Sequence, residues 1–144
     1  MNTIYLDRLI ENAGICFDDG FYWDGFCVTE SDVIKYIQEG GQGASEPYGD
    51  TWKHPAYPKD KEYHVSRVAW FVIHPNEIKG IEIDNEVTCD GRYILPKAIL
   101  VDGWHRIMAA KISNVQKIKA IYGGRIDVLR YLQKRRKTNP ERLA

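Results

Sequence analysis

The chain has few of the residues that build disulfide or zinc sites. Its 144 residues include three cysteines, Cys16, Cys27 and Cys89, and no Cys-x-x-Cys pair. An odd number of widely spaced cysteines argues against both a disulfide framework and a structural zinc site. We therefore expect reduced thiols buried in the core.

Metal-ligand patterns, long apolar runs and a leader are also missing. Four histidines stand at His54, His64, His74 and His105, in spacings that fit no ligand pattern, and we expect no metal site. No apolar run approaches the roughly 18 residues of a membrane span. The opening MNTIYLDRLIENAG lacks the basic and apolar regions of a secretory signal. These absences favour a cytoplasmic protein without membrane contact.

The formal net charge is zero, but the two signs are separated along the chain. Residues 1–50 carry a net charge of −8, and residues 103–144 carry +9. In one interpretation the two ends neutralise each other in the fold. In the other, the basic third meets phosphate while the acidic third faces elsewhere.

The chain length suits one domain with three segments. We expect an acidic, aromatic-rich extension and loop over 1–62, a core over 63–133 and a basic tail over 134–144.

Several elements are expected in the first two thirds of the chain. Residues 2–14 favour a short helix or edge segment that Gly14 ends, and the Asp-Gly turns of 15–28 favour short strands in a hairpin or meander. Thr29 and Asp32 favour a capped helix, followed by a long loop over 40–62. The expected strands here are 64–73, 80–87 and the segment that begins at 90.

The last third favours a strand–helix–strand unit and a final helix. The run at 98–101 does not alternate, so we expect a parallel strand that is buried on both faces. A helix over 104–113, a strand over 117–122 and a helix over 124–137 follow. Ile126, Leu129 and Leu132 form the apolar stripe of the last helix. Residues 138–144 are expected to fray.

The stretch AILVDGWHR, residues 98–106, places a polar cluster where a buried strand passes into a helix. A helix N-terminus attracts anions, phosphates above all, through its N–H groups and partial positive charge. Gly103 lets a ligand approach the backbone, and His105 can donate to phosphate or act as an acid or base near neutral pH. Arg106 is unfavourable in a first turn, so Asp102 or a ligand phosphate compensates it.

Residue types alone leave a plainer interpretation open. Asp102 would then be an N-cap, Gly103 a tight turn, and His105 and Arg106 a solvated helix face. The functional interpretation depends instead on the expected direction of the strand at 98–101. If 98–101 is a parallel strand, the turn lies at its carboxyl end, where ligands bind in open α/β sheets.

The stretch LVDGWHRIMAAKISNVQKIKAIY, residues 100–122, resembles the signature of the ParB/sulfiredoxin superfamily. There a strand enters a Gly-x-His/Arg-Arg turn, followed by a helix with Ala-Ala and another strand. The stretch VAWFVIHPNEIKG, residues 68–80, is similar to the strand and Pro-Asn turn that open ParB domains. The resemblance implies an α/β fold of the α+β kind, with a small mixed sheet and flanking helices.

In that family the turn and the helix N-terminus hold the phosphates of ATP, ADP or CTP. The resemblance implies that Gly103, His105 and Arg106 form a phosphate cradle beside Trp104, while Asp102 orients the turn. Trp104 stands where sulfiredoxins have their reactive cysteine, which excludes sulfinic-acid reduction at this position. The short separation between His74-Pro75 and the turn argues against ParB-type clamping on CTP.

The first function hypothesis is a nucleotide-binding protein that acts as an NTPase, and hence a hydrolase, or as a phosphotransferase. Asp102 and His105 are its candidate catalytic residues. Such chemistry needs Mg²⁺ and carboxylates to place it. The candidate carboxylates are Asp84, Glu86 and Asp90.

Two further hypotheses use the charged ends of the chain. The first is a non-catalytic binding protein or inhibitor of phage or plasmid type, with the acidic N-terminal region as its protein-binding face. The aromatic residues of that face are Phe21, Tyr22, Trp23 and Phe26. The other hypothesis is DNA binding by the basic C-terminal helix that ends in Lys134–Lys137, unless this run is only a solvated tail.

Overall fold

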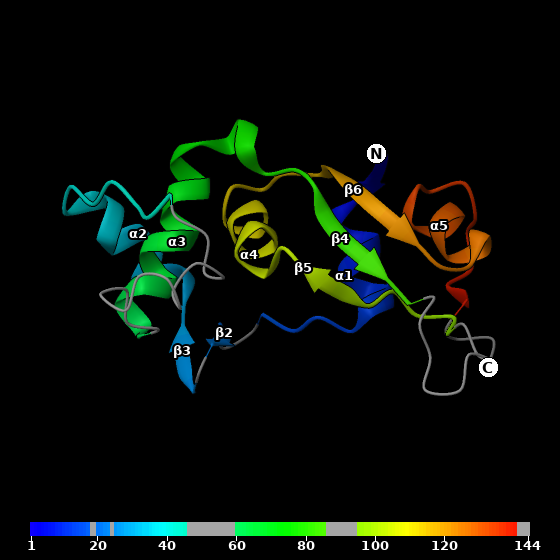
Figure 1. The fold of residues 1–144 in the computed structure, drawn as a ribbon, viewed down its shortest axis with the longest axis horizontal. Coiled ribbons are helices and arrows are strands. Elements are labelled where there is room, and N and C mark those ends of the chain that lie inside the picture. Colours follow the sequence, from blue (N-terminus) through cyan, green and yellow to red (C-terminus); the bar gives the residue numbers. More distant parts are fainter. Residues whose placement is uncertain (18–19, 24, 46–59, 86–94, 141–144) are drawn as a thin grey trace, which may run out of the picture. The chain divides into compact units, whose positions relative to one another are not determined.

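The computed structural model describes residues 1–17, 20–23, 25–45, 60–85 and 95–140. The chain divides into two compact units, which we call unit 1 (Met1–Ile15 with Ile78–Ala144) and unit 2 (Cys16–Glu77). The fold is α+β, with a mixed four-stranded sheet and a separate hairpin, which confirms the fold class expected from the sequence (Figure 1). The first strand and helix belong to unit 1, so the units differ from the expected segments 1–62 and 63–133.

The four-stranded sheet lies in unit 1. Its strands are β1 (Asn2–Tyr5), β4 (Ile81–Asp84), β5 (Leu100–Asp102) and β6 (Lys117–Gly123). The spatial order is β1-β6-β4-β5, and Figure 1 shows β4 between β5 and β6. The central strands β4 and β6 are parallel, whereas β1 and β5 run antiparallel to their neighbours.

One face of this sheet is buried and the other is open. Alternate residues of β6 separate cleanly, with Ile118 and Ala120 buried and Lys117, Lys119 and Ile121 exposed. Strands with a period of two bury one face in this way. The helices of unit 1 are α1 (Leu6–Ala13), α4 (Trp104–Ile112) and α5 (Ile126–Leu132). Their buried residues complete the core of the unit.

Left-handed residues end all three helices of unit 1. Gly14, with φ 68°, ends α1 as expected. Asn114 (φ 55°) follows α4 and Lys134 (φ 60°) follows α5. The expected helix over 124–137 is therefore too long, because the chain turns at Lys134 and leaves the basic run outside the helix. The expected stripe is also wrong at one end, since Ile126 is 60% exposed.

The described residues of unit 2 form a hairpin and two α-helices. Its elements are β2 (Phe21–Trp23), β3 (Phe26–Val28), α2 (Glu30–Gln38), α3 (Lys61–Ile73) and the short 3-10 helix η2 (Pro75–Glu77). The hairpin is confirmed. The cap of α2 is confirmed too, because Thr29 Oγ1 accepts from the Asp32 N–H and Asp32 Oδ2 accepts from the Thr29 N–H.

The strand expected over 64–73 is wrong, because these residues form most of α3. Its branched and aromatic residues reflect burial on several sides of a helix rather than a pleated surface. Val65, Val68 and Phe71 are all buried. The start signal was present in the sequence, since the Asp60 side chain accepts from the Tyr63 N–H at 2.8 Å as an N-cap does. The ParB-like opening strand at 68–73 is therefore helical here.

The parallel strand expected over 98–101 is also wrong. β5 is the edge strand of the sheet and pairs antiparallel with β4, with Asp102 opposite Glu82. Ile99 and Val101 are 42% and 54% exposed, so the unbroken apolar run does not mark burial on both faces. The turn after β5 therefore lies near the amino end of β4, and the rule for carboxyl ends of parallel strands does not apply to it.

Three smaller expectations change in the structure. Cys16 is exposed and Cys27 half-buried, so neither is a core thiol, while Cys89 lies outside the described residues. The start of the expected fraying tail is anchored, because Asn139 is buried and its Oδ1 accepts from Asn12 Nδ2 at 2.9 Å. The loop core 46–59 and the strand expected from 90 lie outside the described residues. Each helix of the described chain is too short or too polar to span a bilayer.

Candidate functional site

The Asp102–Arg106 turn joins β5 to α4, as the sequence predicts. Gly103 is the N-cap of α4, with φ 112°, and the cap makes no side-chain hydrogen bond. A Cβ on Gly103 would lie 2.7 Å from Ile81 Cγ2 and 3.2 Å from Ile81 Cα. Both the left-handed backbone and the close approach of β4 therefore require glycine here. The side of Gly103 that lacks a Cβ is therefore filled by Ile81, and the glycine itself is buried rather than open to a ligand as the sequence predicts.

Arg106 is held against the backbone at the start of β4. Its Nη1 donates to the Gly80 carbonyl at 3.2 Å, and its Nη2 lies 4.0 Å from Asp102 Oδ2. The arginine side chain is 22% exposed and that of Asp102 is 69% exposed. The geometry is therefore compatible with compensation of the Arg106 charge either by Asp102 or by a ligand phosphate. Asp102 is near enough for a weak pair, and part of the arginine side chain remains accessible to solvent.

The structure brings the other predicted site residues to the same turn. Trp104 and His105 are half-buried in the first turn of α4. Of the proposed magnesium ligands, Asp84 is half-buried at the end of β4, whereas Glu86 and Asp90 lie outside the described residues. Within the described ranges, no three His, Cys, Asp or Glu side chains gather closely enough to hold a metal ion.

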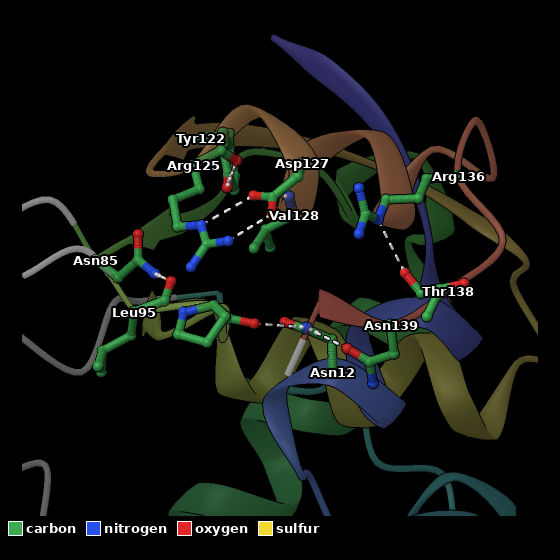
Figure 2. Close-up of polar contacts among 11 residues, drawn as sticks. Asn12, Asn85, Leu95, Tyr122, Arg125, Asp127, Val128, Arg136, Thr138 and Asn139 are labelled. Carbon is green, nitrogen blue, oxygen red and sulfur yellow. Dashed lines mark hydrogen bonds and ion pairs between the residues drawn. The ribbon is translucent and has the colours of Figure 1, made fainter. Parts of the chain in front are cut away.

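Asn85 and Gly124 lie in close contact just after the parallel strands β4 and β6, and Figure 2 shows Asn85 beside Leu95. Asn85 is 2% exposed, and its Nδ2 donates to the carbonyls of Leu95 at 2.7 Å and Lys97 at 2.6 Å. A Cβ on Gly124 would lie 2.1 Å from Asn85 Oδ1, so this glycine lets β6 end against the asparagine. The contact leaves no space for a ligand between Asn85 and Gly124.

An ion pair beside this contact fixes the start of α5. Arg125 Nε and Nη2 donate to Asp127 Oδ1 at 3.0 Å and Oδ2 at 2.6 Å (Figure 2). These bonds lower the pKa of Asp127 below its usual value, against a rise from partial burial. They also raise the pKa of Arg125. Since each bond joins neighbouring residues of the chain, the pair organises the β6–α5 connection.

Sequence reasoning missed two cavities, which lie in unit 1 away from the Asp102–Arg106 turn. One, of about 330 Å³, adjoins the C-terminal end of α4, and the other, of about 370 Å³, adjoins the start of β1. Tyr5 lines both cavities. Their walls come from segments that are far apart in the sequence, and no local motif marks them.

Comparisons with protein-family models, curated proteins and solved structures found no match. The resemblance to the ParB/sulfiredoxin superfamily therefore stays a prediction that rests on the residues quoted for it. Over 100–122 the observed order of β5, α4 and β6 has the strand–helix–strand form of that signature.

Proposed function

We propose that the chain binds a nucleotide through its phosphates at the N-terminal turn of α4. The observation that carries the proposal is the glycine cap of this helix, with an arginine fixed beside it. Gly103 supplies no capping oxygen, and the guanidinium of Arg106 is oriented by the Gly80 carbonyl. First-turn amides and a positioned guanidinium are the groups that proteins use for phosphate.

The helix dipole adds to this preference. α4 has nine residues, and no acidic residue lies in its first turn to compensate the positive end. Arg106 adds a further positive charge there, so both the helix dipole and the guanidinium stabilise an anion at this position. The family resemblance supports the same placement, with ATP, ADP or CTP as the ligand.

A thermal-shift screen with ATP, ADP and CTP, each with and without Mg²⁺, tests the proposal. A ligand present at a hundred times its dissociation constant stabilises the protein by about 2.7 kcal/mol, which raises the melting temperature measurably. Isothermal titration of the nucleotide that gives the largest shift then compares the wild type with Arg106→Gln. We expect the substitution to weaken binding about ten- to hundredfold, because a charge-assisted phosphate bond is lost.

Two controls keep this test interpretable. Arg106→Lys retains the charge without the fork, so its affinity should fall between those of the wild type and Arg106→Gln. Lys111→Gln removes a cation from the last turn of the same helix and should leave nucleotide affinity unchanged. Absence of any nucleotide shift, or equal losses in Arg106→Gln and Lys111→Gln, would refute the proposal.

Catalysis is a further step of the same proposal. We infer that Asp102 and His105, which flank Gly103 and Trp104, are the residues that would act on a bound nucleotide in an NTPase or phosphotransferase. Release of inorganic phosphate from ATP or CTP with Mg²⁺ measures this directly. His105→Gln should abolish the release, and its loss of nucleotide affinity should be smaller than that of Arg106→Gln, because glutamine can still donate a hydrogen bond to phosphate.

A second candidate function is non-catalytic binding of a protein partner through unit 2. The observation that favours it is the exposure of two aromatic rings on the β2–β3 hairpin, Tyr22 at 68% and Phe26 at 41%. Large exposed aromatic side chains are typical of recognition surfaces. Affinity capture that depends on both Tyr22 and Phe26, and does not depend on Arg106, would favour this function over nucleotide binding.

A further inference from the structure

The two cavities of unit 1 meet at Tyr5, where β1 passes into α1. The first cavity is lined by Tyr5, Leu6, Asp7, Ile10, Ala110, Lys111, Asn114, Val115, Gln116 and Lys134. The second is lined by Met1, Asn2, Thr3, Tyr5, Lys117, Gln133 and Arg135. Because they share Tyr5, they form adjoining hollows on one side of unit 1.

The walls of these cavities are strongly basic. Lys111, Lys117, Lys134 and Arg135 contribute four cations, against the single carboxylate of Asp7. That carboxylate lies 3.3 Å from Lys134 Nζ. Among the described residues, the other three cations have no ion pair. The hollows therefore present an excess of positive charge that no described carboxylate neutralises.

The Tyr5 ring joins the cations of the two cavities. Lys134 Nζ lies 4.4 Å from the ring centroid and Lys117 Nζ lies 5.3 Å from it, both within reach of a cation–π interaction. The backbone at this point is held because Tyr5 is the N-cap of α1 and the next amide, of Leu6, donates to the Gln116 carbonyl at 2.9 Å. The two ammonium groups thus share one aromatic side chain on an anchored backbone.

The backbone of Lys134 shows that a lysine stands where a glycine fits better. The Lys134 N–H donates to the Tyr131 carbonyl and the Arg135 N–H to that of Arg130, so the helix ends in a Schellman turn. The left-handed position of that turn, φ 60° here, favours glycine, and a lysine there is uncommon. The backbone gains nothing from the lysine, so its contribution must come from the side chain that reaches Tyr5 and Asp7.

The basic run after α5 is fixed on both sides of this position. Arg8 Nη1 donates to the Arg136 carbonyl at 3.0 Å, and the Arg8 guanidinium stacks 4.3 Å above the Tyr131 ring. Further along, Asn139 is tied to Asn12. The backbone of the run is therefore anchored to the rest of unit 1.

We propose that this basic surface, formed by Lys111, Lys117, Lys134 and Arg135 around Tyr5, binds the phosphodiester backbone of a nucleic-acid strand. Four cations spread over two adjoining hollows match a series of phosphates better than one anion. Cationic grooves of this kind bind single strands with release of counterions, so the binding weakens with salt. The surface lies at the opposite end of α4 from the nucleotide site, and the inference does not depend on that site.

Fluorescence anisotropy with a labelled single-stranded DNA oligonucleotide tests the proposal on the full chain. The double variant Lys117→Gln/Lys134→Gln should weaken binding at low salt about tenfold or more. Its slope of log K against log salt should flatten by about 1.4, the value expected for two lost contacts with a single strand. Far-ultraviolet circular dichroism establishes that the variant is folded, and Lys111→Gln/Arg135→Gln provides a second pair that should behave alike.

The matched control is Lys79→Gln/Lys119→Gln, which removes two exposed cations of unit 1 that line neither cavity. It should leave the slope within a few tenths of the wild type. Inorganic phosphate at the same phosphate concentration should compete far less well than unlabelled oligonucleotide. The proposal is overturned by a wild type that does not bind the oligonucleotide, by equal losses in the control pair, or by equal competition from inorganic phosphate.

Discussion

The two ends of α4 carry positive charge in different ways. At the N-terminus the charge belongs to Arg106, which bonds to the Gly80 carbonyl and is 22% exposed. At the C-terminal end and beyond it, the charge belongs to exposed lysines, Lys111 in the last turn of α4 and Lys134 after α5, that line an open cavity. The first arrangement suits one oriented phosphate. The second suits a longer anion that is bound without a fixed geometry.

The two arrangements also differ in how the sequence encodes them. The N-terminal turn is one continuous pentapeptide, Asp102 to Arg106, so its residue types can be recognised directly in the sequence. The other surface joins residue 5 of the first strand to residues 111–117 and 134–135. Such a surface exists only after β1 has paired with β6 and α5 has folded beside β1. A local motif is therefore a poor guide to where most of the accessible charge lies.

The largest expected effect is on stability, at the N-terminal turn. Gly103→Ala should lower the free energy of unfolding by about 2–4 kcal/mol, because it adds a left-handed alanine and a contact with the Ile81 backbone. Urea denaturation measures the change. The matched control is Gly80→Ala, where φ is 73° and the nearest atom, Met1 Sδ, is 4.0 Å from the added Cβ. It should cost about 1–2 kcal/mol, and equal losses would mean that the contact with Ile81 is easily relieved.

A substitution at Lys134, beyond the C-terminal end of α4, should raise the free energy of unfolding rather than lower it. Lys134→Gly relieves a left-handed lysine and loses an exposed ion pair and a cation–π contact with Tyr5, both of which contribute little at an exposed site, so stability should rise by up to about 1 kcal/mol. The same variant should bind the oligonucleotide less tightly. Denaturation and anisotropy on one protein sample measure both effects. A variant that is stabilised but binds as the wild type does would remove Lys134 from the proposed nucleic-acid surface.

The smallest effects should come from substitution of Asp102 and Asp7, whose carboxylates are both exposed. Asp102 is 69% exposed near Arg106, and Asp7 is 68% exposed near Lys134. Asp102→Asn and Asp7→Asn should each change stability by less than about 0.5 kcal/mol, since exposed ion pairs contribute little. Asp7→Asn should raise oligonucleotide affinity about two- to threefold at low salt, because it removes a negative charge beside the phosphates. Asp102→Asn should leave that affinity unchanged.

Local signals in the sequence predicted the elements that local interactions determine. The capping box of Thr29 and Asp32, the αL glycine at 14, the hairpin and the alternation along β6 were all legible. The misassigned elements were those whose environment comes from distant residues. The composition of α3 reflects burial within unit 2, and the apolar run of β5 lies at a sheet edge that nothing in its own residues reveals.

The candidate site also has a part that the local sequence predicted and a part that depends on distant residues. The Asp102–Arg106 turn was found because glycine, histidine and arginine are adjacent in the chain. The bond from Arg106 to Gly80 was not predictable, because it depends on β4 lying beside the turn. Lys134 was expected to lie in the last helix. Its left-handed backbone results from the Schellman turn and could not be predicted from its residue type.

The most direct test of the account is a crossed titration. ATP with Mg²⁺ and a labelled single-stranded oligonucleotide are each titrated into the wild type, Arg106→Gln and Lys117→Gln/Lys134→Gln. The account predicts that Arg106→Gln loses ATP affinity about ten- to hundredfold and keeps oligonucleotide affinity within a few-fold. The lysine pair should show the reverse pattern. If either variant lost both affinities in equal measure while remaining folded, the claim of two separate phosphate-binding regions would be contradicted.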